Sequence, residues 1–180
     1  MSDITILSEK IKFKAELFTV TETVLRLKNG KKTIHHNVER HTTVNIFPLT
    51  SSYEIYLVSQ YRPLLKKTTL EAVAGFIEEK ETSLAAAKRE LKEEAGLRAF
   101  HWEEIARIEA AASVVKASTH LFLAKGFEEG EQEQDEDEDI TLVKIPLEEA
   151  VQKVITGEIN AAGSMIGIML LDRLRKEKKI

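Results

Sequence analysis

Cysteine is absent from this sequence of 180 residues. A disulfide framework, a thiolate metal site and a cysteine nucleophile are therefore excluded. Long apolar runs are absent as well, since the longest patch, residues 165–171, is far shorter than the roughly 18 residues that a membrane-spanning helix needs. Residues 1–4 show no basic segment followed by an apolar run, so we expect no secretory signal. These absences are consistent with a cytoplasmic protein that has no membrane contact, which is our expectation.

An excess of positive charge is absent: the net charge is −4, and the only basic cluster is the tail from Arg173 to Lys179. The chain therefore lacks the basic surface of a protein that coats nucleic acid, and an anionic substrate would need a metal ion to mediate its contact. Hydrophobic residues make up 43% and charged residues 31%, as is typical of a folded globular chain. We expect a single domain over residues 1–180, because no long linker divides the sequence.

Residues 4–62 have the composition of β-strands. Thr21–Leu27 and Thr33–Val38 flank Asn29-Gly30, which predicts a hairpin because both of these residues tolerate the positive φ of a tight turn. Further strands are predicted at Thr42–Leu49, Tyr53–Ser59, Thr68–Ala72, Glu103–Ala111 and Thr119–Ala124. The chain is therefore expected to begin with an antiparallel β region and to continue into a larger sheet.

A helix is predicted between residues 82 and 96. Thr82 or Ser83 can cap its start, and Gly96 stands where a left-handed C-terminal cap belongs. The apolar residues of this segment repeat at helical spacing, at Leu84, Ala87, Leu91 and Ala95. Closing helices are predicted at Leu147–Thr156 and Ala161–Lys176, with breaks at Gly157 and Gly163. Strands, a helix, more strands and then helices indicate a mixed sheet packed between helices.

Three carboxylates lie beside the apolar stripe of the first predicted helix. Glu90, Glu93 and Glu94 fall within one arc of about 100° on an ideal helix. Like charges so close together destabilise a helix unless something compensates, and Mg²⁺ is suited because it takes carboxylate oxygens and keeps positions open for phosphate. Arg89 could orient Glu93, and Glu81 could hold Arg89. The alternative is that these residues form the solvated face of an ordinary amphipathic helix.

The spacing of these residues distinguishes the two interpretations. From Gly75 the chain reads Gly-Phe-Ile-Glu-Glu-Lys-Glu, and after seven residues it continues Arg89-Glu90-Leu91-Lys92-Glu93-Glu94-Ala95-Gly96-Leu97. This resembles the Nudix box, G-x5-E-x7-R-E-U-x-E-E-x-G-U with U aliphatic, at every specified position. A chance match at one starting point has a probability below roughly one in ten million at ordinary residue frequencies. The resemblance implies an α/β/α sandwich in which the box forms a loop, a helix and a loop.

The resemblance also implies Mg²⁺, or Mn²⁺, as cofactor and hydrolysis of a diphosphate linkage by an activated water. Carried over by position, Glu90 and Glu94 would be the principal metal ligands. Glu93 would be a further ligand or would hold metal-bound water, and the backbone carbonyl of Ala74 would complete the site. The remaining positions would support the site: Arg89 and Glu81 as orienting residues, Gly75 by letting the backbone approach the metal, and Gly96 as the helix cap.

Further segments resemble the ADP-ribose pyrophosphatase branch of the Nudix family. Gln60-Tyr61-Arg62, Glu71–Gly75 and Ile145–Ala150 are similar to parts of that branch. The implied substrate is a small molecule, ADP-ribose or a related nucleoside diphosphate sugar, which would be cut to a nucleoside monophosphate and a sugar phosphate. The implied assembly is a homodimer formed through residues 1–41, with residues 42–180 as the Nudix core.

Two departures from the branch concern its substrate preference. Val73 replaces a usual proline, which is a mild change. Ala110–Ser118 lacks the proline-glycine turn whose proline marks ADP-ribose preference. GDP-mannose, a dinucleoside polyphosphate or a nucleoside triphosphate therefore stays open as the substrate, as does a non-catalytic nucleotide-binding module.

Other residues have weaker claims. The acidic stretch Glu128–Asp139 lies where the branch carries a catalytic glutamate; Glu133, Glu136 or Glu138 could be that general base, and we favour Glu136. The alternative is a self-repelling surface loop. Arg62 could pair with a substrate phosphate, or it could be a structural arginine at a strand end. We therefore assign catalytic roles to Glu93, Glu94, Arg89 and Glu136, and we find no nucleophile context around Ser164.

Overall fold

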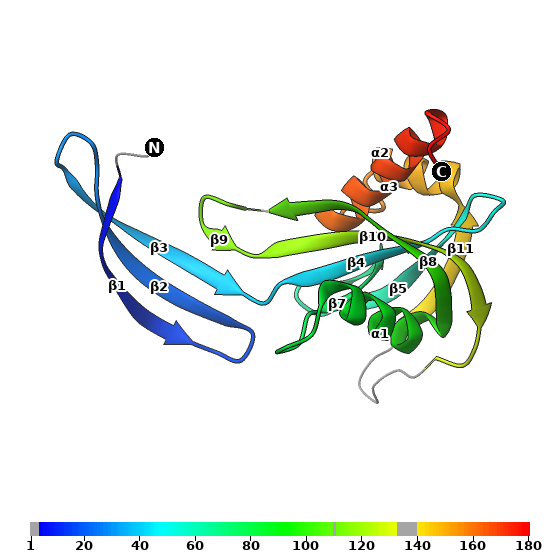
Figure 1. Ribbon diagram of the computed structural model, residues 1–180, viewed down its shortest axis with the longest axis horizontal. Coiled ribbons are helices and arrows are strands. Elements are labelled where there is room, and N and C mark those ends of the chain that lie inside the picture. Colours follow the sequence, from blue (N-terminus) through cyan, green and yellow to red (C-terminus); the bar gives the residue numbers. More distant parts are fainter. Residues whose placement is uncertain (1–3, 110, 133–139) are drawn as a thin grey trace. The chain divides into compact units, whose positions relative to one another are not determined.

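The computed structural model describes residues 4–109, 111–132 and 140–180 (Figure 1). Contacts within the chain divide it into two compact units. The N-terminal unit comprises Met1–Thr42 and Glu109–Ser118, and the main unit comprises Thr43–Ile108 and Thr119–Ile180. No helix in the described residues is long and apolar enough to cross a membrane.

The N-terminal unit is a sheet with the strand order β1-β2-β3-β9. Its strands are β1 (Thr5–Lys14), β2 (Phe18–Arg26), β3 (Lys32–Arg40) and β9 (Val115–Lys116). The predicted hairpin is confirmed as β2 and β3, which pair antiparallel around Gly30 at a φ of 80°. Strand β9 was not predicted, and it runs parallel to β3, with Val115 opposite Val38.

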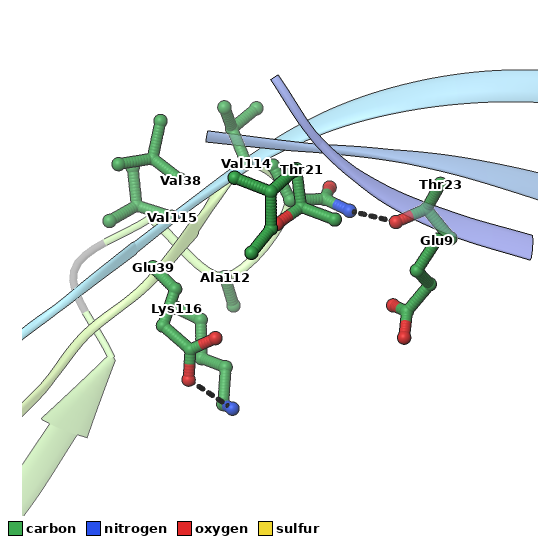
Figure 2. A pocket seen from close by; sticks show the side chains of 11 residues that line it. Glu9, Thr21, Thr23, Val38, Glu39, Ala112, Val114, Val115 and Lys116 are labelled. Atoms are coloured by element: carbon green, nitrogen blue, oxygen red, sulfur yellow. Dashed lines mark hydrogen bonds and ion pairs between the residues drawn. The ribbon is translucent and has the colours of Figure 1, made fainter. Parts of the chain in front are cut away.

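This unit has almost no interior. Among its described residues, Thr23 alone is buried, with 3% of its surface exposed. Large apolar side chains stand in solvent instead, and they are Ile4, Ile6, Ile11, Phe13, Leu17, Phe18, Ile34 and Val114. A pocket of about 430 Å³ opens in the unit, and Figure 2 shows the Lys116–Glu39 ion pair there. In the same pocket, the hydroxyl of Thr23 accepts a hydrogen bond from Asn37. Exposed apolar side chains in such number are typical of an interaction surface.

The main unit contains two sheets and the helices. The sheet with the order β7-β4-β10-β8 is mixed, because β4 runs parallel to β10 and antiparallel to β7. The sheet with the order β11-β5-β6 is antiparallel. The strands are β4 (Thr43–Pro48), β5 (Glu54–Arg62), β6 (Lys67–Glu71), β7 (Val73–Phe76), β8 (Leu97–Glu109), β10 (Ser118–Glu129) and β11 (Ile140–Pro146). The helices are α1 (Ser83–Ala95), α2 (Leu147–Ile155) and α3 (Ala162–Lys176).

Alternate residues of the central strands enter two separate hydrophobic clusters. Leu57 and Leu121 pack with α2 and α3, whereas Val58 and Phe122, their neighbours in the chain, pack with α1. Side chains of a strand point alternately to its two faces, so both faces are covered. Figure 1 shows α1 on one side of these strands and α2 and α3 on the other. The predicted α/β/α sandwich with a mixed sheet is thus confirmed.

The helix boundaries agree closely with the sequence, with one exception. Thr82 caps α1, since its hydroxyl accepts a hydrogen bond from the amide of Ala85 at 3.2 Å, and Gly96 ends the helix at a φ of 64°. Gly157 follows α2 as predicted. The predicted break at Gly163 is wrong, because Gly163 lies inside the first turn of α3. Its lack of a side chain serves packing, since a Cβ there would lie 2.8 Å from the side-chain Nδ2 of Asn45.

Candidate active site

Helix α1 presents its glutamates at the edge of its buried face. Ala86, Ala87, Leu91 and Ala95 bury that face against the sheets. The same rotation of the helix places Glu90, Glu93 and Glu94 beside β7, whose residues contact α1. Lys88 is exposed, as expected for the opposite face. The amphipathic pattern of the sequence therefore determines where the carboxylates point.

Arg89 connects the carboxylates of the Nudix-like segment. Its Nε and one terminal nitrogen donate to both carboxylate oxygens of Glu81, at 3.2 and 3.1 Å. Its other terminal nitrogen donates to Glu90 at 2.7 Å and to Glu93 at 3.0 Å. Burial alone would lower the pKa of Arg89, but these hydrogen bonds raise it well above its ordinary value. The guanidinium is therefore a permanent cation that offsets repulsion among the glutamates.

Glu81 is held from two sides in the loop before the helix. Arg89 lowers the pKa of the Glu81 carboxyl by hydrogen bonding, and the backbone amide of Glu78 adds a bond of 3.1 Å. The carboxylate is therefore ionised at neutral pH and keeps Arg89 in place. Glu81 thus contacts Arg89, as the sequence indicated, and its role as an orienting residue stays a prediction.

Strand β7 approaches the helix closely enough to contact two of the glutamates. Glu94 is buried, and its Oε2 accepts a hydrogen bond from the amide of Ala74 at 3.0 Å. Glu90 lies against Gly75, where a Cβ would come within 1.8 Å of its Oε1. Only glycine at position 75 leaves room for the Glu90 carboxylate in this position.

These groups surround one cleft of about 500 Å³. Its lining consists of Gln60, Arg62, Ala74, Gly75, Phe76, Glu78, Arg89, Glu90, Glu93 and Glu94. In the described part of the chain, every site residue proposed from the sequence lines this cleft except Gly96 and Glu81, and Glu81 is hydrogen bonded to Arg89. Gln60 belongs to the Gln60-Tyr61-Arg62 segment, but sequence reasoning gave it no role. Glu78 was missed because it lies among the unspecified positions of the box.

The chemistry of this cleft fits a hard divalent cation. Four carboxylates and the backbone of Ala74 supply the oxygen ligands that Mg²⁺ prefers, and Gly75 leaves space beside Glu90. As they stand, no three His, Asp or Glu side chains in the described parts of the chain are grouped so that they could hold a metal ion. One reason is that the guanidinium of Arg89 already hydrogen bonds two of the carboxylates in the cleft, those of Glu90 and Glu93.

Arg62 lines the cleft and is also bound to a neighbouring strand. Its guanidinium donates to the two oxygens of Glu71 at 3.2 and 2.8 Å, and the hydroxyl of Thr69 donates to Glu71 at 2.6 Å. Burial alone would raise the pKa of Glu71, but the hydrogen bonds from Arg62 and Thr69 lower it below its ordinary value. Arg62 therefore forms a structural ion pair at its strand end and also lines the cleft.

Gly96 makes a contact in addition to ending α1. Its carbonyl accepts a hydrogen bond from the amide of Gly130 at 2.7 Å, and a Cβ on Gly96 would lie 2.6 Å from the Gly130 carbonyl. The side-chain amide of Gln132 donates to the carbonyl of Glu94 at 2.5 Å. The beginning of the acidic stretch is thus attached to the end of the helix. Glu133, Glu136 and Glu138 lie outside the described residues.

Comparison with known proteins decides the family. A model of the NUDIX domain matches residues 39–163, which is more than half of the chain. The chain belongs to the Nudix family. It is accordingly a pyrophosphohydrolase, and Nudix hydrolases act on small nucleotide molecules and generally use divalent metal ions.

Curated relatives match nearly the whole chain. The chain is 29% identical over 169 residues to a methanol dehydrogenase activator from Bacillus methanolicus, covering 93% of this chain and 91% of the relative. It is equally 29% identical over 169 residues to an ADP-ribose pyrophosphatase from Bacillus subtilis (strain 168), again covering 93% and 91%. A crystal structure of an ADP compounds hydrolase covers 100% of this chain and 98% of its own, with a TM-score of 0.87 and 24% identity. That last similarity establishes the fold.

Proposed function

We propose that this Nudix enzyme hydrolyses the diphosphate of ADP-ribose or a related nucleoside diphosphate sugar, giving a nucleoside monophosphate and a sugar phosphate. The observation that carries the proposal is the cleft in which Glu90, Glu93 and Glu94 converge with Arg62. The sequence similarity to an ADP-ribose pyrophosphatase supports the choice of substrate class.

Mg²⁺ would be held by Glu90, Glu94 and the carbonyl of Ala74, with Glu93 as a further ligand or as the group that holds a bound water. When bound, the cation supplies neutralisation of the diphosphate and a lowered pKa for an attacking water. The chain would contribute by holding Glu90 and Glu93 together through hydrogen bonds from Arg89, which Glu81 in turn holds in place. Arg62 contributes a positive charge at the wall of the cleft for a phosphate oxygen. We retain Glu136 as the proposed general base.

A second substrate class is favoured by one observation. The segment that lacks the proline-glycine turn forms a turn closed by hydrogen bonds from Val114 and Val115 to the carbonyl of Ala111, followed by β9 in the N-terminal sheet. The sequence marker of ADP-ribose preference is thus absent from this turn. Another nucleoside diphosphate derivative, such as GDP-mannose, is therefore the alternative substrate.

We further propose that the protein is a homodimer formed through its N-terminal unit. The exposed apolar residues of this sheet, including Ile11 and Phe13, need a covering layer, and Thr23 alone among its described residues is buried. A second copy of the chain is the partner that is always available at the same concentration. The side of the sheet that carries the pocket of Figure 2 offers both apolar and hydrogen-bonding groups to such a partner.

A substrate panel tests the proposed activity. The wild-type protein is incubated with Mg²⁺ and ADP-ribose, GDP-mannose, a dinucleoside polyphosphate or a nucleoside triphosphate, and a phosphatase liberates phosphate from the products. Glu94→Gln removes one proposed ligand charge, whereas Glu79→Gln makes the same change at an exposed residue that does not line the cleft. We expect turnover of ADP-ribose by the wild type and by Glu79→Gln, and loss of turnover in Glu94→Gln.

The outcomes separate the alternatives. Turnover of another nucleotide alone would retain the diphosphate chemistry and exclude ADP-ribose as the substrate. Wild-type turnover that survives in Glu94→Gln would contradict the assignment of the cleft. No turnover of any nucleotide, with Mg²⁺ or with Mn²⁺, would favour a nucleotide-binding module instead.

A further inference from the structure

Ser164 is a buried polar residue outside the cleft. Its side chain has no exposed surface, and its hydroxyl oxygen accepts a hydrogen bond from the backbone amide of Ala72 at 2.9 Å, from 92 residues away in the chain. We propose that Ser164 is a positioning residue that fixes the segment Ala72–Gly75, so that the Ala74 carbonyl and Gly75 lie correctly for the metal site. This inference rests on the proposed function, because it assigns Ser164 a role at that same site.

Ala72 occupies the point where the chain passes from one sheet to the other. Glu71, the last residue of β6, pairs with Val58 of β5. Val73, the first residue of β7, pairs with Ile46 of β4. Ala72 itself belongs to neither strand and is only 1% exposed, so its amide needs an acceptor within the protein. Ser164 provides that acceptor.

Two glycines allow α3 to bring Ser164 close enough. A Cβ on Gly163 would lie 2.8 Å from the side chain of Asn45, and a Cβ on Gly167 would lie 1.9 Å from the ring of Phe47. Asn45 and Phe47 belong to β4, so the start of α3 lies directly against this strand. Because β4 also pairs with β7, the helix, β4 and the start of β7 form one packed block.

The hydrogen bond between Ala72 and Ser164 bears on the cleft, because residues that line the cleft follow Ala72 within three positions of the chain. Ala74 donates its amide to the buried carboxylate of Glu94, and Gly75 lies against the carboxylate of Glu90. A displacement at Ala72 would therefore move the backbone that contacts both proposed ligands. Ser164 itself does not line the cleft. Its effect on chemistry can only be indirect, through the position of β7.

The test compares Ser164→Ala with Ser164→Thr, which keeps the hydroxyl, and with Ile168→Val. Ile168 is buried one turn further along α3 and loses only a methylene group, so this control weakens the same helix without touching the hydrogen bond. Three quantities are measured: amide hydrogen exchange over residues 72–76, the dissociation constant for Mn²⁺ by electron paramagnetic resonance, and the thermal midpoint of unfolding.

In Ser164→Ala the amides of Ala72 and Ala74 are expected to exchange faster, and Mn²⁺ is expected to bind more weakly, by at most the roughly 10- to 100-fold that follows the loss of a direct partner of a ligand. Raising the Mn²⁺ concentration should restore most of its turnover. Ser164→Thr should stay near the wild type, and Ile168→Val should change only the thermal midpoint.

Unchanged exchange at residues 72–76 in Ser164→Ala would overturn the anchor, whether or not the protein binds metal. Unchanged Mn²⁺ affinity with faster exchange would overturn the link between the anchor and the site. Failure of the proposed function has a different signature, because the wild-type protein itself would then bind no Mn²⁺.

Discussion

The two units of this chain bury their side chains to very different extents. In the main unit both faces of the central strands are covered, and residues such as Leu57 and Leu91 have no exposed surface. In the N-terminal unit Thr23 alone is buried among the described residues, while Ile11 is 61% exposed. The difference shows that the cleft of the Nudix enzyme stands on a well-buried core, and it is the reason why we propose a covering partner for the N-terminal sheet.

Truncation of a core residue should show the largest difference between the units. Leu57→Ala removes a side chain from the cluster beside α2 and α3, and we expect the free energy of unfolding to fall by about 2–5 kcal/mol. Ile11→Ala in a protein dilute enough to be monomeric should change it by less than about 0.5 kcal/mol. Urea unfolding followed by circular dichroism measures both variants. Equal losses would mean that the N-terminal unit has an interior of its own.

A charged residue placed on the N-terminal sheet tests whether its exposed apolar side chains form the proposed dimer interface. Ile11→Lys would bury an ammonium group at the proposed interface in each copy, and we expect the dissociation constant of the dimer to rise about 100-fold or more. Sedimentation equilibrium measures this constant, with Asn29→Lys at the exposed hairpin turn as the matched control. A wild-type protein that is monomeric at high concentration, or a dimer indifferent to Ile11→Lys, would contradict the proposed interface.

Substitutions at two glycines of the main unit distinguish an effect on activity from an effect on packing and stability. Gly75→Ala displaces the flexible Glu90 carboxylate, so we expect activity to fall by about 10- to 100-fold with little change in the thermal midpoint. Gly167→Ala collides with the buried ring of Phe47, and overpacking of this kind costs about 1–3 kcal/mol of stability. Assays and melting curves of the pair give the measurement. A Gly75→Ala enzyme with wild-type activity would show that Glu90 need not lie against this glycine.

A more modest effect is expected at the cap of α1. Thr82→Ala removes the acceptor for the amide of Ala85, and we expect a loss of about 1 kcal/mol from the main unit. Thr82→Ser should retain most of the stability, because it keeps the hydroxyl. Thermal unfolding of the two variants gives the comparison. A loss in Thr82→Ser as large as that in Thr82→Ala would show that the hydroxyl is not what stabilises this end of the helix.

The sequence indicated the features that depend on local pattern. Helix α1 could be predicted because its cap, its apolar period and its terminal glycine lie within 15 residues, from Thr82 to Gly96. The hairpin around Gly30 has an equally local signal. The spacing of the box placed Glu90, Glu93 and Glu94 on one side of the helix, and the structure brings them to one cleft.

Features that depend on distant partners could not be predicted in this way. Strand β9 has only two residues, and it exists because Val115 and Lys116 pair with β3 from a remote part of the chain. Gly163 resembled a helix break because glycine usually marks one, yet here it gives α3 close access to Asn45. The bidentate pairing of Arg62 with Glu71 and the bond from Ala72 to Ser164 likewise have no local signature.

Direct measurement of cation binding tests the central claim, which is that the carboxylates of α1 form the metal site of this Nudix enzyme. Mn²⁺ is titrated into the wild type, into Glu79→Gln and into the double variant Glu90→Gln with Glu94→Gln, and free Mn²⁺ is followed by electron paramagnetic resonance. We predict that the wild type and Glu79→Gln bind Mn²⁺, that Mg²⁺ displaces it, and that the double variant does not bind it. Equal binding by the double variant, or no binding by the wild type, would contradict the account.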